Sequence, residues 1–329
     1  MLLQQTDLHE LMRSDMERVR DRVTDAARIR YADISPILEG IVQAGGKRLR
    51  PMLLLLAGRP YQYDSKLEVL ITAAAGVELL HTASLVHDDT VDRAAIRRGK
   101  PTLNSMFDAG SVILIGDYLF AQSAILAAAT GSTRVVSIFA STLADICDGQ
   151  LMEMIEATDL DQTVERYSQR IFGKTASLFA GAAEMGAVIS GAPELGIQEL
   201  RAFGTDVGLA FQITDDVLDL VGKSNDLGKP AGNDLRQGTI TLPVIHFLNG
   251  PEISASARSR IATIVAGDAS DEMIEQTLTE IRSSGCAEQS LRDAERIVQQ
   301  AKNRLSMIKD PAARESLMEF ADLAVNRDS

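Results

Sequence analysis

Apolar residues recur at steps of three and four along most of this 329-residue sequence, a spacing that places them on one face of an α-helix. Aromatic residues make up 4% of the chain and Trp is absent, whereas a β-sandwich needs more aromatic and β-branched residues. We predict a long helix from about Leu67 to beyond Asp92. We predict further helices over residues 8–31, 110–129, 132–157, 161–190, 195–221 and 239–249, with two or three more after residue 256. The sequence therefore predicts an all-α protein.

The chain has no low-complexity linker, internal repeat or shift in composition that would mark a domain boundary. Glycine and proline instead indicate loops between the predicted helices, at residues 97–104 and most clearly at the polar, glycine-rich stretch 222–238. We therefore expect residues 1–329 to form a single helical domain.

The net charge of −13 is unfavourable for binding nucleic acid, because a phosphate backbone requires Lys and Arg over a broad surface. An acidic chain can still bind a small anionic substrate where its basic residues are concentrated. Cys147 and Cys286, the only cysteines, are far apart and lack metal-ligand spacing. We therefore expect neither disulfides nor a structural zinc site, and a reducing, cytoplasmic location.

The first residues of the chain mix charged and apolar side chains and lack the apolar core of a signal peptide. The best candidate for a membrane span, residues 109–130, is interrupted by Asp117 and Gln122. We expect this segment to be a buried core helix, and we expect no stable insertion into a membrane.

Two acidic clusters repeat the pattern Asp-Asp-x-x-Asp inside apolar predicted helices, one formed by Asp88, Asp89 and Asp92 and the other by Asp215, Asp216 and Asp219. Residues four apart share a helix face, where like charges repel. One such cluster could be a solvated acidic patch, but two identical clusters without an internal basic residue indicate a compensating cation. Carboxylate oxygens suit Mg²⁺, which also binds water and substrate phosphates. We predict that both clusters are catalytic and hold a substrate diphosphate through Mg²⁺.

Basic residues gather beside glycine in the same chain. Residues 45–51, GGKRLRP, contain Lys47, Arg48 and Arg50, and residues 97–100 follow the first acidic cluster with Arg97, Arg98 and Lys100. Lys174 and Lys229 each follow a glycine. Segment 45–51 could alone be a basic helix end. Together these groups suit diphosphates, because glycine permits close approach of the backbone and Lys and Arg bind phosphate oxygens.

The sequence has no zinc-type histidine spacing, nucleophilic triad, Walker loop or dinucleotide-binding loop. Instead, five segments in the expected order resemble the motifs of the all-trans polyprenyl diphosphate synthases, a family of trans-prenyltransferases. They are GGKRLRP at 45–51, HTASLVHDDTVDRAAIRRGKPT at 81–102, GKTASLFA at 173–180, FQITDDVLD at 211–219 and GKPAGNDLRQGTITLP at 228–243. The resemblance runs from about residue 35 to 250 and, more weakly, over residues 320–327.

The resemblance implies a bundle of long helices around a deep central cavity, usually as a homodimer, with isopentenyl diphosphate and an allylic prenyl diphosphate as substrates. It implies that about three Mg²⁺ ions bind the allylic diphosphate. Their implied ligands are Asp88, Asp92, Asp215 and Asp219, with Asp89 and Asp216 supporting the metal shell. Isopentenyl diphosphate would bind Lys47, Arg50, His81 and Arg98. The allylic diphosphate would contact Arg97, Lys174, Thr175, Gln212 and Lys229, with Lys174 also catalytic and Asp234 closing over the site.

One segment departs from the family pattern. After Cys147 the family commonly has an acidic residue, Gly and Glu, followed by Gln, whereas this chain has Gln150 and Glu153 in roughly exchanged places. The resemblance therefore implies no detailed role for Gln150 or Glu153.

Two small residues, Ala83 and Ser84, lie one turn before Asp88 and so beneath it along the helix. In family members that stop at short products, a bulky aromatic residue commonly blocks one of these positions. Both are small here, which predicts a product longer than a farnesyl chain, in the medium or long range and suited to a quinone side chain. Ala83 and Ser84 could instead serve only helix packing.

Other functions remain open at this point. A shorter-chain farnesyl or geranylgeranyl diphosphate synthase would carry the same motifs. A class I terpene cyclase needs only one diphosphate site, so the set formed by residues 47–50, His81 and Arg98 argues against it. A non-catalytic subunit of a heteromeric synthase typically loses one acidic cluster, and this chain keeps both. A helical scaffold protein would leave the matched clusters unexplained.

Overall fold

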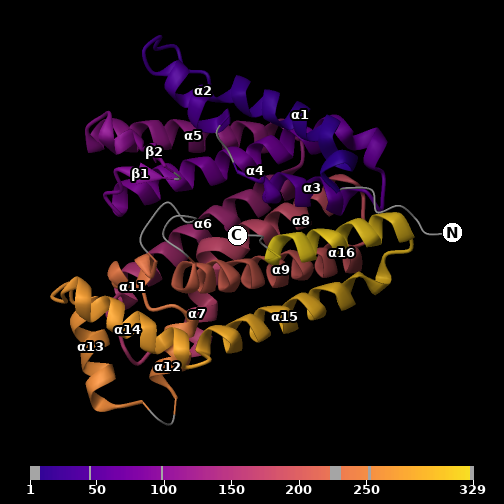
Figure 1. The fold of residues 1–329 in the computed structure, drawn as a ribbon. Coiled ribbons are helices and arrows are strands. Elements are labelled where there is room, and N and C mark those ends of the chain that lie inside the picture. The colour runs from indigo at the N-terminus through magenta and orange to yellow at the C-terminus, as the bar shows by residue number, and fades with distance from the viewer. Residues whose placement is uncertain (1–7, 44–45, 98, 223–230, 251–252, 327–329) are drawn as a thin grey trace. The chain divides into compact units, whose positions relative to one another are not determined.

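The computed structural model of the chain describes residues 8–43, 46–97, 99–222, 231–250 and 253–326 (Figure 1). The secondary structure of these residues is helical except for one short antiparallel hairpin, in which β1 (Ile96–Arg97) pairs with β2 (Lys100–Pro101). The predicted all-α fold class is confirmed.

Contacts among Cα atoms divide the chain into two compact units. The first unit comprises residues 1–143, 178–204 and 304–320, and the second comprises residues 144–177, 205–303 and 321–329. The divisions fall within helices rather than at linkers, so the expected single domain remains a prediction.

The first unit is built around α4 (Tyr63–Val91), which contacts α1 (Leu8–Ala27), α3 (Leu49–Gly58) and α5 (Ala109–Ala129) (Figure 1). Residues 70–80 of α4 are all buried, as expected of a helix that is apolar on every side. A Cβ added to Gly186 would lie 2.1 Å from the carbonyl oxygen of Leu54, so α3 and α8 (Ser177–Ile189) meet through their backbones. The unit also contains α2 (Ser35–Gln43), η1 (Leu103–Ser105), η3 (Leu305–Met307), the hairpin and parts of α6 (Thr133–Glu156), α9 (Glu194–Val221) and α16 (Pro311–Val325).

The second unit contains the end of α6, α7 (Val164–Ile171), the π-helix η2 (Phe172–Ala176) and the last part of α9. It continues with α11 (Asn233–Arg236), α12 (Leu242–Leu248), α13 (Ala255–Val265), α14 (Asp271–Ser283) and α15 (Cys286–Arg304). The helix predicted over residues 161–190 is confirmed over residues 164–189, where α7, the π-helix η2 and α8 follow one another without a break. α7 begins at Val164 because the Thr163 hydroxyl accepts a hydrogen bond from the Arg166 amide at 3.2 Å, and a π-helix follows it.

Three helices, α4, α5 and α6, are long and apolar enough to cross a membrane, by length and composition alone. In α4, 78% of the most apolar 18-residue stretch is buried. The corresponding share is 39% in α5 and 33% in α6. The expectation that residues 109–130 form a buried core helix is therefore wrong for most of that stretch.

Candidate active site

The first acidic cluster lies at the C-terminal end of α4. Asp88 and Asp89 belong to the last turn of α4, and Asp92 follows the helix as its C-cap, where its amide donates to the Asp88 carbonyl at 2.8 Å. The last turn contains no basic residue. The C-terminal end of a helix carries partial negative charge, which disfavours carboxylates and favours a bound cation.

The hairpin after α4 is tied to this cluster through Asp89. The Arg97 side chain donates from Nε to Oδ1 of Asp89 at 2.7 Å, and the Asn104 amide donates to the Asp89 carbonyl at 2.7 Å. Burial raises the pKa of the Asp89 carboxyl, and the Arg97 guanidinium opposes that rise. Arg97, predicted to contact the allylic diphosphate, thus lies beside the first acidic cluster.

Two of the residues predicted to bind isopentenyl diphosphate meet in the first unit. Nη1 of Arg50 lies 3.2 Å from Nε2 of His81, and the guanidinium lies 4.6 Å from the centroid of the Phe179 ring. The ring lies against the guanidinium while Nη1 of Arg50 faces the imidazole of His81. Lys47 is exposed, and Arg98 lies outside the described residues.

The second acidic cluster lies near the C-terminal end of α9, which also has no basic residue in its last turn. Asp215 is exposed, whereas Asp216 and Asp219 are buried. The Asp234 amide donates to Oδ2 of Asp219 at 3.0 Å, and the Gly232 amide donates to the Asp219 carbonyl at 2.7 Å. Residues 232–234 are therefore anchored on this cluster through their backbone amides.

A chain of hydrogen bonds links the predicted allylic-site residues to the second cluster. Thr175 donates to Oε1 of Gln212 at 2.7 Å, and Nε2 of Gln212 donates to Oδ1 of Asp216 at 2.7 Å. The hydroxyl of Tyr167 donates to Oδ2 of Asp216 at 2.7 Å. Burial raises the pKa of the Asp216 carboxyl well above its usual range, and the negative charge of Asp234 adds to the rise. Burial also raises the pKa of the Tyr167 phenol, so Tyr167 remains a donor.

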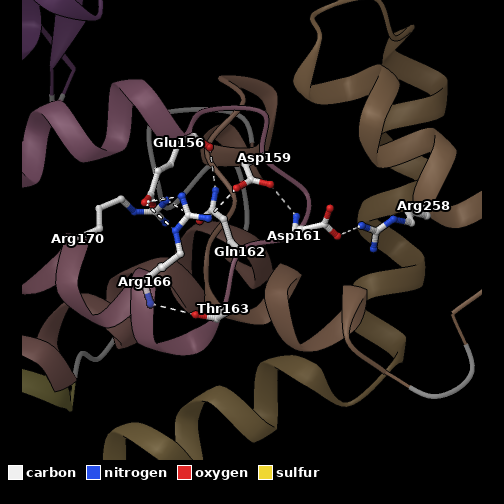
Figure 2. Close-up of polar contacts among 8 residues, drawn as sticks. All are labelled: Glu156, Asp159, Asp161, Gln162, Thr163, Arg166, Arg170 and Arg258. Atoms are coloured by element: carbon white, nitrogen blue, oxygen red, sulfur yellow. Dashed lines mark hydrogen bonds and ion pairs between the residues drawn. The ribbon is translucent and has the colours of Figure 1, made fainter.

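The connection between α6 and α7 is held by ion pairs and hydrogen bonds, which Figure 2 shows. Arg166 bridges Glu156 and Asp159, with nitrogen–oxygen distances of 3.0 Å to each. The buried Arg170 donates to Oε1 of Gln162 at 2.8 Å and to the carbonyl of Ile240 at 2.6 Å. These contacts fix α7, and with it Tyr167, against the segment that follows α11.

The carboxylates fit Mg²⁺ that is bound together with a diphosphate. Among the described residues, no three His, Cys, Asp or Glu side chains are grouped to hold a metal ion by themselves. Protein Mg²⁺ sites commonly use one or two carboxylates and take their other ligands from water and substrate phosphate. Each cluster by itself lies near a helix end whose last turn contains no basic residue, and so supplies carboxylates of that kind.

The remaining predicted residues are placed as follows. Ala83 is fully buried in α4, and Ser84, half-buried, donates to the His81 carbonyl at 2.8 Å. Lys174 lies in the π-helix and forms an ion pair with Glu153 of α6. Lys229 lies outside the described residues.

Sequence reasoning missed three residues that contact the predicted site: Tyr167, Asn104 and Phe179. Asn104 lies two residues after the motif at 81–102, and Phe179 belongs to the motif at 173–180. Neither residue was predicted to have a role. Tyr167 lies outside every motif, and its only signal was a hydroxyl on the apolar face of the predicted helix. Contacts between residues far apart in the sequence, such as Tyr167 with Asp216, are not encoded in any local spacing.

The helices that end in carboxylate clusters belong to an all-helical fold, and the solved structures similar to it have the isoprenoid synthase fold. The sequence matches the family model for polyprenyl synthetases over residues 32–281. The chain belongs to the polyprenyl synthetase family.

Several relatives share most of its length. The chain is 40% identical over 249 residues to component 2 of the heptaprenyl diphosphate synthase of Geobacillus stearothermophilus, covering 76% of this chain and 77% of that protein. It is similar to the crystal structure of a decaprenyl diphosphate synthase from Rhodobacter capsulatus, with 37% identity, a TM-score of 0.89 and 97% of each chain covered. It is also similar to a polyprenyl synthase from Caulobacter crescentus complexed with calcium and isoprenyl diphosphate, with 35% identity, a TM-score of 0.90 and coverage of 98% and 97%.

Proposed function

We propose that this chain is a prenyltransferase that condenses isopentenyl diphosphate with an allylic prenyl diphosphate in successive head-to-tail steps. The product is an all-trans polyprenyl diphosphate. The observation that carries the proposal is the pair of Asp-Asp-x-x-Asp clusters, each near the C-terminal end of a long helix whose last turn contains no basic residue. Membership of the polyprenyl synthetase family supports the same reaction.

The reaction transfers a prenyl group between two diphosphate esters. The allylic C–O bond breaks, and its electron pair leaves with the diphosphate. The double bond of isopentenyl diphosphate then attacks the allylic carbon, and a proton is lost from the new chain to the released diphosphate. This last step explains why the motifs include no dedicated general base. Holding both substrates in one site removes much of the entropic cost of their meeting.

The side chains of the protein bind, orient and shield the substrates. Asp88, Asp92, Asp215 and Asp219 would hold Mg²⁺ on the allylic diphosphate. The bound ions would supply positive charge that stabilises the leaving diphosphate. Lys47, Arg50, His81 and Arg98 would bind isopentenyl diphosphate, while Arg97, Lys174, Thr175, Gln212 and Lys229 would contact the allylic diphosphate. Apolar walls would exclude water from the cation.

The ion stoichiometry is a finer part of the proposal. We propose about three Mg²⁺ ions for each active site, because two clusters and a diphosphate together provide more oxygen ligands than one octahedral ion can use.

We propose that the product is a medium- or long-chain polyprenyl diphosphate and that it supplies the side chain of a quinone. Two similar proteins, a heptaprenyl and a decaprenyl diphosphate synthase, are named for such products. Within this chain, the small Ala83 and Ser84 lie one turn before Asp88, so the helix carries no bulky ring at these two positions.

We also propose that the chain acts as a homodimer in the cytoplasm, without inserting into a membrane. Supporting this, α5 exposes Ile113, Leu114 and Ile125, of which Leu114 is 69% exposed. Apolar side chains on a long helix favour coverage by another protein surface. A second copy of the chain would supply such a protein surface, and no other protein would be needed.

The reaction is tested by incubating the purified chain with Mg²⁺, isopentenyl diphosphate and allylic primers of several lengths, followed by chromatography of the products. We expect elongated prenyl diphosphates. Cyclic hydrocarbons would instead identify a terpene cyclase, and turnover only after a second subunit is added would identify a component of a heteromeric synthase.

Removal of single carboxylates tests the acidic clusters. We expect Asp88→Ala and Asp215→Ala each to lower turnover by about 100-fold or more, because each loses a ligand for the charge on the leaving diphosphate. Circular dichroism should show an unchanged helical fold. Asp268→Ala, at an exposed position between α13 and α14, is the matched control and should retain normal turnover. Near-normal turnover in Asp88→Ala or Asp215→Ala would refute the metal roles.

A bulky ring at position 84 tests the control of product length. We expect Ser84→Phe to shorten the products, because Ser84 is half-buried and can accept a larger side chain more easily than the fully buried Ala83. Ser65→Phe, at an exposed position of the same helix, is the control and should leave the products unchanged. If Ser84→Phe gives the same products as the unmodified chain, position 84 does not limit chain growth.

A further inference from the structure

Lys174 and Glu153 form an ion pair within the second unit, between the π-helix η2 and α6. Their side chains are 28% and 21% exposed, so water screens this pair less than it screens pairs on the surface. Lys174 is one of the residues proposed to contact the allylic diphosphate. The Lys174 ammonium group is therefore already paired with the Glu153 carboxylate, at the place where we expect it to contact the diphosphate of the substrate.

Two glycines bring the backbones of these elements together. A Cβ added to Gly149 would lie 2.2 Å from the Lys174 amide nitrogen, and one added to Gly173 would lie 2.7 Å from the Asp145 carbonyl oxygen. Only glycine fits at this crossing. Glu153 lies four residues after Gly149, and so one turn along the same face of α6. The crossing thereby sets the Glu153 carboxylate beside the Lys174 side chain.

The π-helix gives the same segment an unusual local geometry. It covers residues 172–176 and directs both Lys174 and Thr175, whose hydroxyl donates to Gln212 at 2.7 Å. Single-turn π-helices interrupt the regular spacing of side chains and are frequent at functional sites. Lys174 is thus placed by three fixed features: the glycine crossing, the π-helix and the ion pair with Glu153.

We propose that Glu153 is a positioning residue that orients the Lys174 ammonium and competes with diphosphate for it. This inference rests on the prenyltransferase function proposed above. An incoming diphosphate must share or displace the Glu153 carboxylate, and the carboxylate repels the anion. Glu153 therefore weakens the hold of the site on diphosphate. This favours release of the inorganic diphosphate formed in every condensation, a step that can limit turnover.

The proposal is tested by calorimetric titration of the full chain with inorganic diphosphate in the presence of MgCl₂. Four proteins are compared: the unmodified chain, Glu153→Gln, Lys174→Gln and the double variant. We expect Glu153→Gln to bind diphosphate about tenfold more tightly and Lys174→Gln about tenfold more weakly. The double variant should match Lys174→Gln, because Glu153 acts through the lysine.

Glu295→Gln is the matched control, since it removes the same charge from an exposed position of α15 and should leave the affinity unchanged. In the prenyl transfer assay, Glu153→Gln should show stronger inhibition by added inorganic diphosphate. Unchanged or weaker diphosphate binding by Glu153→Gln would overturn the proposal, as would equal tightening in Glu295→Gln.

Failure of this inference and failure of the proposed function give different results. If the unmodified chain neither binds diphosphate nor elongates a primer, the prenyltransferase function is wrong. If the unmodified chain does both, and Glu153→Gln binds diphosphate as the unmodified chain does, only the role of Glu153 is wrong.

Discussion

Asp216 shows how one residue of an acidic cluster differs from its neighbours. Both of its carboxylate oxygens accept hydrogen bonds from protein donors, Oδ1 from Gln212 and Oδ2 from Tyr167. Asp215, beside it in the sequence, is exposed. A buried carboxylate with two strong donors is an anchor for the helix that carries it, because removing either donor leaves a costly buried acceptor. Asp216 thus positions the end of α9.

Removing the Tyr167 hydroxyl tests this anchor. We expect Tyr167→Phe to lower the free energy of unfolding by about 1–3 kcal/mol, since Oδ2 of the buried Asp216 loses its donor. Turnover should fall by about 10-fold to 100-fold, because Asp216 supports the neighbouring metal ligands. Urea unfolding and the prenyl transfer assay measure the two effects.

The control for this variant is Tyr31→Phe. Tyr31 is 60% exposed, so losing its hydroxyl should change the free energy of unfolding by less than about 0.5 kcal/mol. Equal stability of Tyr167→Phe and the unmodified chain would show that Tyr167 does not anchor Asp216.

At the scale of elements, the close contact between α6 and the π-helix depends on glycine at two positions. The atoms nearest to a Cβ at Gly149 are backbone atoms of Gly173 and Lys174, all within 2.8 Å. Backbone atoms cannot rotate away as a flexible side chain can. A larger residue at Gly149 must therefore push the two elements apart, which would also separate Lys174 from Glu153.

We predict that Gly149→Ala lowers the free energy of unfolding by about 3 kcal/mol, the upper end of the usual cost of overpacking. Gly40→Ala is the matched control: no atom lies within 4 Å of the added Cβ, and alanine in a helix stabilises by about 0.5–1 kcal/mol relative to glycine. A Gly149→Ala chain that is as stable as the Gly40→Ala chain would refute the close contact.

The sequence predicted the long helices well because each has a continuous apolar stripe. The predictions for residues 110–129, 132–157 and 195–221 differ by only a residue or two from α5, α6 and α9. Within residues 161–190 the π-helix at 172–176 was not predicted, because a π-helix changes the hydrogen-bonding partner without changing which residues are apolar. The short helix α2 was also not predicted.

The candidate site was predictable to the extent that its residues belong to local motifs. Spacing alone indicated the two acidic clusters, and the structure places each at a helix end. Spacing could not indicate which residues, distant in the sequence, those side chains contact in the folded chain. The pairing of Arg50 with His81 and of Lys174 with Glu153 depends on helix packing, which no local pattern encodes.

For the whole molecule, the unusual feature is the exposure of apolar side chains on two long helices. α5 exposes Ile113, Leu114 and Ile125, and α6 exposes Leu151, Met154 and Ile155, the last at 80%. Both helices were predicted from their apolar residues, and the apolar pattern alone did not reveal which of those residues are covered. Isolated exposed apolar residues are ordinary, but several on one helix favour association.

Introducing a charged residue on α5 tests whether a second copy of the chain or a membrane covers these side chains. We expect the unmodified chain to have twice the mass of a single chain in light scattering after size-exclusion chromatography. Leu114→Asp should shift it toward the monomer, because burying an unpaired carboxylate in an apolar interface costs several kcal/mol, about 3–5 by comparison with broken buried pairs. Ser65→Asp adds the same charge at an exposed position of α4 and should remain dimeric. A monomeric unmodified chain that binds phospholipid vesicles through α5 would show that a membrane, and not a second copy, covers these side chains.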